Sequence, residues 1–287
     1  MLLKLIAAIT MLIDHIGYYF FRWLPNDLYF TFRSIGRLAF PIFAYYIALG
    51  YRRTGHLWRY FLRLLGFAVI SEVIIRRGHE LAAIHSSGTN ILFTFAAALG
   101  FISGWTLLTN SWRDRVARLE LLTDAGRENN DQNYYQIKFT PGDVSLHPAL
   151  GMLLGIAAMI VSLAAVIYLK SDYGIYGVLT VFAFHLVLTS NKDEEDLSVL
   201  LNKSLLAITA LNIGTLITYH FILGMPEEFS YYQLLSILSV FIIFSSKAGK
   251  QALYGSKPTA WKRYSLYVFY PLHIFILCLI VYLIRIC

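Results

Sequence analysis

The sequence contains few charged residues and almost no cysteine. Only 14% of its 287 residues are charged, against about 25% in soluble domains, while 57% are hydrophobic. This composition excludes a soluble globular protein and an intrinsically disordered chain. The two cysteines, Cys278 and Cys287, lie in or at the end of the last apolar run. Neither a disulfide framework nor a cysteine metal site is therefore indicated.

The sequence has instead a series of apolar segments, and a helix needs about 20 such residues to cross a bilayer. The period-two alternation of an outer-membrane barrel is absent. We therefore expect an all-α protein, a polytopic transmembrane bundle of about nine helices in one domain over residues 1–287. A polar cytoplasmic insertion at about 111–146 should contain an amphipathic helix near 112–120 and a short hairpin near 134–139. The segments are expected at about 2–22, 28–51, 57–77, 88–109, 147–169, 173–190, 203–223, 231–246 and 264–286.

The basic residues predict the orientation of this bundle. Sixteen of the 24 lysines and arginines fall on the side of the amino terminus, five on the other side and three within segments. Because basic residues concentrate in cytoplasmic loops, we expect the amino terminus inside and the carboxyl terminus outside. The net charge of +7 is spread over short loops, which argues against a nucleic-acid-binding face.

Ionisable residues inside the apolar segments mark the candidate site, since a charge within a bilayer costs several kcal/mol. At about 1.5 Å per residue they lie roughly 14 to 22 Å from the inner face, in one layer. Asn90 stands at the mouth of the fourth segment, close to that layer. No metal-ligand spacing accompanies them, so no metal is expected. The ionisable members are Asp14, His15, Arg33, Arg37, Glu72 and His273.

The spacing of these residues suggests how they pair. Arg33 and Arg37 are four residues apart and should share one helix face. Asp14 and His15 are adjacent and point about 100° apart, so Asp14 should neutralise one of the two arginines. His15 would then face a cavity, with Glu72 or a backbone carbonyl as its orienting group, although the charges could also serve only as ion pairs between helices.

Residues 4–17 (KLIAAITMLIDHIG), 35–44 (IGRLAFPIFA) and 71–72 (SE) combine ionisable residues with apolar sequence. These stretches resemble the TraX family of bacterial membrane acetyltransferases. Further similar stretches are residues 90–94 (NILFT), 172–178 (DYGIYGV) and 270–273 (YPLH). The polar stretch from about 124 to 143 has no counterpart in the family pattern.

This resemblance implies an acyl-CoA-dependent transferase of the inner membrane, with acetyl-CoA as donor. The acceptor would be an amine, such as a peptide or pilin amino terminus, or a hydroxyl of a small molecule at the outer face. In such an enzyme His15 would act as the base or carry a transient acetyl group, and Arg37 and Asn90 would stabilise the oxyanion. Basic residues of the second loop could hold the phosphates of the donor, although they could also be plain topology signals: Arg52, Arg53, Arg59 and Arg63.

A second function class uses the same residues. Asp14, His15 and Glu72 could form the proton relay of a proton-coupled transporter or exporter. A relay would place titratable groups across the whole thickness of the membrane, whereas here they share one layer. The sequence therefore favours the enzyme and keeps the transporter as the alternative.

Overall fold

The computed structural model describes residues 2–125, 135–137, 144–190, 197–218, 220, 228–245, 253 and 260–286. The described chain is nearly all helical, as expected, with one short antiparallel hairpin of β1 (Tyr135–Ile137) and β2 (Val144–Leu146). Five helices are long and apolar enough to cross a membrane: Leu2–Tyr19, Ile91–Val116, Pro148–Tyr168, Leu197–Ile217 and Tyr264–Ile286.

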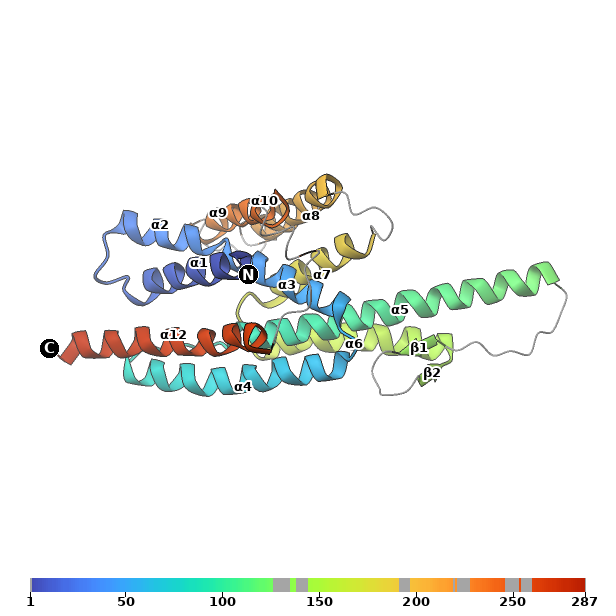
Figure 1. The fold of residues 1–287 in the computed structure, drawn as a ribbon, viewed down its shortest axis with the longest axis horizontal. Helices are drawn as coiled ribbons and strands as arrows, with labels where there is room; N and C mark the ends of the chain where they lie inside the picture. Colours follow the sequence, from blue (N-terminus) through green and yellow to red (C-terminus); the bar gives the residue numbers. More distant parts are fainter. Residues whose placement is uncertain are drawn as a thin grey trace.

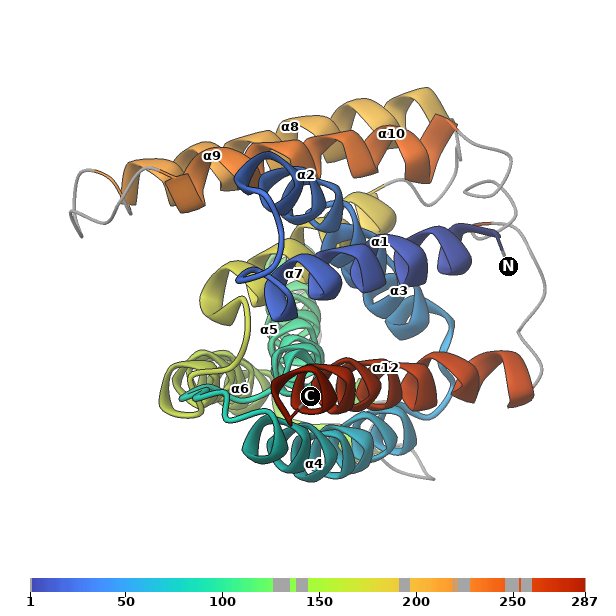
Figure 2. The ribbon, with the colours of Figure 1, turned by 90° about the vertical axis from the view of Figure 1, so that its left-hand side faces the viewer.

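The helices form three layers, which Figures 1 and 2 show from two directions. One outer layer holds α8 (Leu197–Ile217), α9 (Glu228–Leu234) and α10 (Leu238–Ser245). The other holds α4 (Leu57–Leu81), α5 (Ile91–Ala125), α6 (Pro148–Tyr168) and α12 (Ala260–Ile286). Between them lie α1 (Leu2–Tyr19), α2 (Asn26–Gly36), α3 (Ala39–Arg53) and α7 (Gly174–Ser190).

Two expected segments are interrupted rather than continuous. The segment expected at 28–51 breaks into α2 and α3 at Arg37 and Leu38. The segment expected at 231–246 contains a 3₁₀ turn, Leu235–Ile237, between α9 and α10. Both interruptions put backbone polar groups inside an apolar stretch, where they are tolerated only beside protein or a water-filled cavity.

The largest shift of a boundary is at the end of α5, which lies at Ala125 rather than 109, and α8 begins at Leu197 rather than 203. The amphipathic stretch expected as a separate interfacial helix near 112–120 is instead the continuation of α5, a 35-residue helix. No helix breaker separates it from the apolar part, since Trp112 to Leu119 contains neither glycine nor proline. A hairpin was expected near 134–139, and β1 lies there, but its partner β2 lies outside this range, so that Gln136 pairs with Ser145.

The loop between α4 and α5 folds back along α4. The side-chain amide of Asn90 donates to the carbonyl of Ala68 at 2.8 Å, and Ala68 lies thirteen residues before the end of α4, a rise of about 20 Å. The loop between α6 and α7 meets it there, because Thr89 and Ser171 form a parallel bridge. Helices α5 and α7 therefore both begin well inside the bundle.

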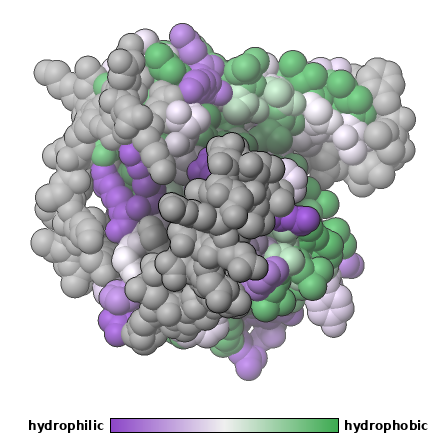
Figure 3. Space-filling model, turned by 90° about the vertical axis from the view of Figure 1, so that its right-hand side faces the viewer, coloured by the Kyte–Doolittle hydropathy of each residue, from purple (hydrophilic) through white to green (hydrophobic). Residues whose placement is uncertain are grey.

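The surface of the bundle matches a membrane protein. Pro148–Tyr168 has the highest mean hydropathy of the five long helices, 2.6, and only 22% of it is buried inside the protein. Seen from the end at which α5 projects, hydrophobic side chains gather along the upper and right-hand flanks of the molecule (Figure 3). Apolar residues turned outward in this way are solvated by lipid chains rather than by water.

Candidate functional site

The interrupted helix and the two folded-back loops enclose a cavity of about 2130 Å³. Its wall combines the end of α1, the break between α2 and α3, the C-terminal half of α4, both loops, α7 and α8. Three non-glycine residues of these loops have positive φ angles, namely Ala83 at 49°, Lys170 at 46° and Tyr173 at 61°. Such strained conformations cluster at functional sites. All three residues line the cavity.

His15 of α1, which lines the cavity, makes a short polar contact with His273 of α12, which lies behind it. His15 Nδ1 lies 2.6 Å from His273 Nε2. The second ring nitrogen of His273, Nδ1, donates to the carbonyl of Phe269 at 2.8 Å. In a neutral pair, His273 Nε2 must then accept from His15 Nδ1–H, which leaves the lone pair on His15 Nε2. The fold thus fixes His15, which lines the cavity, in the tautomer of a proton acceptor.

This partner differs from the expected one, since Glu72 or a carbonyl was expected to orient His15. The Glu72 carboxylate is already held at 2.9 Å by the backbone and side-chain amides of Asn90 and at 2.6 Å by Arg76. Glu72 therefore anchors the folded-back loop. Asn90 is equally occupied, because its amide nitrogen donates to Ala68 and Glu72 while its oxygen accepts from the Leu92 backbone at 3.0 Å.

The charges on α1 and α2 pair in one of the two ways that the spacing allowed. Asp14 Oδ2 lies 2.8 Å from Arg33 Nη1, so Arg33 rather than Arg37 makes the direct ion pair. Gly36 permits this approach, because a Cβ atom there would lie 2.2 Å from the Asp14 Cβ. The sequence shows only that a glycine precedes Arg37. It does not show that this glycine lets α1 approach α2.

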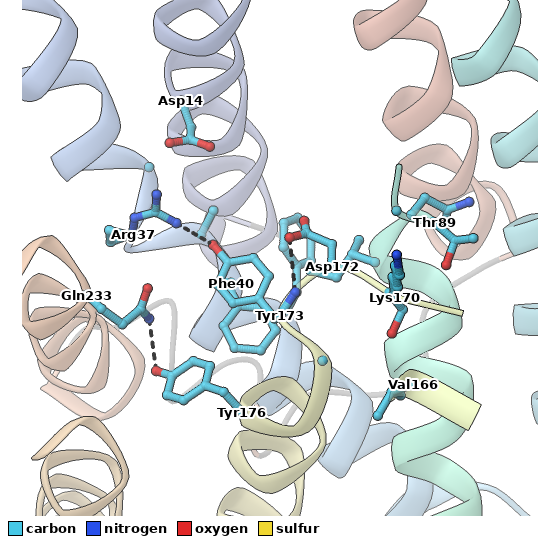
Figure 4. Close-up of a pocket in the computed structure, with 18 of the residues that line it drawn as sticks. Asp14, Arg37, Phe40, Thr89, Val166, Lys170, Asp172, Tyr173, Tyr176 and Gln233 are labelled. Atoms are coloured by element: carbon cyan, nitrogen blue, oxygen red, sulfur yellow. Dashed lines mark hydrogen bonds between the residues drawn. The ribbon is translucent and has the colours of Figure 1, made fainter. Parts of the chain in front are cut away.

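Arg37 instead donates to the hydroxyl of Tyr173 at 3.0 Å, as Figure 4 shows. Tyr173 stacks on Phe40 with ring centroids 4.0 Å apart, which fixes its hydroxyl beside the guanidinium. Burial raises the pKa of the neighbouring Asp172 carboxyl, and Arg37 opposes that rise. Sequence reasoning missed Tyr173, although it stands in the stretch 172–178 and precedes Gly174, a turn signal.

The four arginines expected to hold the donor are not among the residues that line the cavity. Arg52 and Arg53 end α3, and Arg59 and Arg63 lie in the first two turns of α4. Arg53 donates to the carbonyl of Leu253, and Arg63 lies over the ring of Tyr60 at 5.2 Å. A donor held at Arg53 would have to reach the cavity at Phe43, about 15 Å away along α3.

No group of three histidine, cysteine, aspartate or glutamate side chains able to hold a metal ion is found within the described part of the chain. Three lysines near the start of the last segment form a second basic group that could hold the donor, namely Lys247, Lys250 and Lys257. They lie outside the described residues, as does the acidic run from Asp193 to Asp196. Cys278 is buried and reduced.

The fold and the cavity define a polytopic helical membrane protein with a polar site inside its bundle. A family model described as TraX protein matches residues 1–281. The chain therefore belongs to the TraX family, as the resemblance of its motifs predicted. No match was found among curated proteins or among solved structures.

Proposed function

We propose that this protein is an acyl-CoA-dependent acyltransferase of the inner membrane, with acetyl-CoA as donor and an amine or hydroxyl at the outer face as acceptor. A peptide or pilin amino terminus is one acceptor of this kind. The observation that carries the proposal is the His15–His273 pair, which places a tautomerically fixed imidazole on the wall of a large cavity. A neutral imidazole with a free lone pair is suited to general-base catalysis.

In the proposed reaction, the acceptor nitrogen or oxygen attacks the thioester carbonyl carbon while His15 Nε2 takes its proton. The new C–N or C–O bond forms, the C–S bond breaks, and the leaving thiolate receives the proton from His15. His273 accepts the hydrogen bond of the His15 imidazolium throughout, in the manner of an orienting group. Arg37 and Tyr173 are the donors placed to stabilise the carbonyl oxygen as it becomes negative.

Tyr173 replaces Asn90 in this assignment. Both hydrogens of the Asn90 amide have protein partners, whereas the Tyr173 hydroxyl accepts from Arg37 and still has its own proton to donate. Asn90 and Glu72 act as positioning residues, because together they hold the loop that closes one side of the cavity.

The experiment uses variants that separate base chemistry from structure. In His15→Asn, the amide nitrogen stands near the position of Nδ1 and keeps the bond to His273, but no atom replaces Nε2. We expect kcat for acetyl transfer from acetyl-CoA to fall by about 10²-fold or more, with the melting temperature unchanged. His273→Gln, which retains an acceptor near Nε2, should keep more activity than His273→Ala.

The exposed His56 provides the control, and His56→Ala should act like the wild type. Activity of His15→Asn within a few fold of wild type would remove His15 from the chemistry. The transporter alternative predicts no acetylated product in any variant. The described part of the cavity favours the enzyme, because its continuation along α7 is lined by apolar residues such as Phe182 and Leu186 rather than by a relay.

A further inference from the structure

The cavity has a second, apolar part that the proposed chemistry does not use. Along α7 it is lined by Leu179, Phe182, Ala183, Leu186 and Val187, and along α8 by Ala207, Ala210, Leu211, Gly214 and Thr215. These ten residues follow the spacing i, i+3, i+4, i+7, i+8 on each helix, so they mark one face of α7 and one face of α8. Asn212, Leu216 and Thr218 also line the cavity beside this face of α8. Figure 2 shows α7 lying between α6 and α8. The groove is defined by these ten residues with Val166 and Ile167 of α6.

The groove is continuous with the polar site and open on one side. Val166 and Tyr176 lie at the bottom of Figure 4, away from Asp14 at the top, and all three line the same cavity. Ile167 is 61% exposed and Leu186 is 38% exposed although both line it. Its length along α8, from Ala207 to Thr215, is about 12 Å. The total volume of 2130 Å³ exceeds the roughly 300 to 1,000 Å³ of most small-ligand sites.

The residues that define the groove offer no free side-chain hydrogen-bond donor to an occupant. The hydroxyl of Thr215, and that of Thr218 beside it, donate to carbonyls of their own helix, at Leu211 and Gly214. The pantetheine arm of coenzyme A and an extended peptide both carry amide carbonyls, which would find no donor here, at a cost of several kcal/mol. A hydrocarbon chain has no such groups. A hydrocarbon chain in the groove also makes van der Waals contacts with the aliphatic side chains of the walls, which an empty groove would leave without partners.

We propose that this groove binds the hydrocarbon chain of the acceptor, so that the acceptor is a membrane-embedded amphiphile whose polar end carries the amine or hydroxyl. This inference rests on the proposed function and specifies its substrate class. The polar end lies at His15 and Arg37, and the chain runs along α7 and α8 toward the side of the amino terminus. With the amino terminus in the cytoplasm, that is the orientation of a lipid in the outer leaflet.

Gly214 supplies a direct test, because a Cβ at this position would meet nothing within 4 Å. Because Gly214 lines the cavity, Gly214→Phe introduces an aromatic side chain into the groove at a position where its first atom has open space. Gly66 of α4 is matched to it, since a Cβ there also meets nothing within 4 Å and Gly66 does not line the cavity. Gly66→Phe controls for the effect of an added aromatic side chain on a membrane-facing helix.

The first measurement needs no enzymatic activity. The full chain in lipid nanodiscs is photolabelled with a long-chain amine that carries a diazirine in its hydrocarbon chain, and labelled peptides are identified by mass spectrometry. Labelling should concentrate on residues 179–187 and 207–215 in the wild type and in Gly66→Phe, and should fall at least tenfold in Gly214→Phe. Equal labelling of Gly214→Phe, or labelling spread evenly over all lipid-facing helices, would overturn the proposal.

The second measurement compares butylamine with dodecylamine as acceptors. In the wild type the KM should fall at least tenfold with the longer chain, and in Gly214→Phe the two amines should have similar KM values while transfer to butylamine persists. Photolabelling of the groove without any transfer would support the groove and reject the enzyme. Transfer without groove labelling or chain-length dependence would reject the groove and leave the enzyme. Displacement of the label only by a hydrophobic helical peptide would overturn the hydrocarbon occupant.

Discussion

At the residue scale, this protein places charges and imidazoles in an apolar bundle and holds them in pairs, Asp14 with Arg33 and His15 with His273. Asp14 and Arg33 leave only 15% and 17% of their side chains exposed. Such a pair contributes little net stability as a unit, because the attraction only offsets the desolvation of both charges. Each charge nevertheless needs its partner, because either one alone would be a buried, unpaired charge.

Neutralising one partner of this pair should therefore be worse than neutralising both. We expect Asp14→Asn to lower the free energy of unfolding by about 3 to 5 kcal/mol, since it leaves the Arg33 charge buried without its partner. The double variant Asp14→Asn, Arg33→Gln should recover a large part of that loss. Denaturant unfolding in mild detergent measures the free energy of unfolding of the single and of the double variant.

The exposed pair of Arg77 and Glu80 is the control, with 72% and 64% of the side chains exposed. Glu80→Gln should cost about 1 kcal/mol or less, because exposed ion pairs are weak. A double variant at Asp14 and Arg33 that is no more stable than Asp14→Asn would contradict the pairing.

Tyr173 gives a second prediction at this scale. Removing its hydroxyl in Tyr173→Phe keeps the stacking on Phe40 but removes one proposed donor to the oxyanion. We expect kcat to fall by about 10²-fold with little change in the donor KM. Tyr168→Phe, at a tyrosine that is 87% exposed, should leave kcat unchanged, and equal values for the two variants would exclude Tyr173 from the chemistry.

At the scale of elements, the close approach of α1 and α2 controls the geometry of the site. Gly17 and Gly36 both face the partner helix, and a Cβ at Gly17 would lie 2.9 Å from the Cβ of Phe32. The two glycines therefore let the helix that carries His15 lie directly against the helix that carries Arg33.

Gly36→Ala should separate these helices, because its Cβ would overlap the Asp14 side chain at 2.2 Å. We expect a loss of about 1 to 3 kcal/mol, as for other overpacking substitutions. Gly66→Ala, with open space around it, should be neutral or stabilising by about 0.5 to 1 kcal/mol in the interior of α4. Similar melting temperatures for the two variants would show that the contact between α1 and α2 yields easily.

At the scale of the whole molecule, the orientation in the membrane remains a prediction from the basic residues. Gly55 lies between α3 and α4, where a side chain would meet nothing within 4 Å, and Ser87 lies in the loop between α4 and α5. In a background with both native cysteines replaced by serine, Gly55→Cys should be protected from an impermeant maleimide in intact cells. Ser87→Cys should react, and the opposite pattern would reverse the orientation and the proposed donor side.

The sequence alone determined the class of protein and most helices. The length and hydropathy of a segment are local properties, and they decide whether that segment is stable in the hydrocarbon core of a bilayer. The sequence also identified the ionisable residues of the site. An ionisable residue in an apolar segment can be recognised without knowing which helices the segment contacts. Sequence reasoning did not predict the break within residues 235–237, where neither glycine nor proline stands. It also missed the break at Arg37, although Gly36 precedes it and Pro41 cannot donate a helical hydrogen bond to the Arg37 carbonyl.

Only the tertiary structure decided which of these residues meet. His15 and His273 are 258 positions apart, and their contact depends on α12 lying against α1. The choice of Arg33 over Arg37 for Asp14 depends on the approach that Gly36 allows. The groove between α7 and α8 depends on how two helices with hydrophobic residues on every side are rotated. Hydropathy has no preferred face in such helices, so packing against neighbours determines which residues line a cavity.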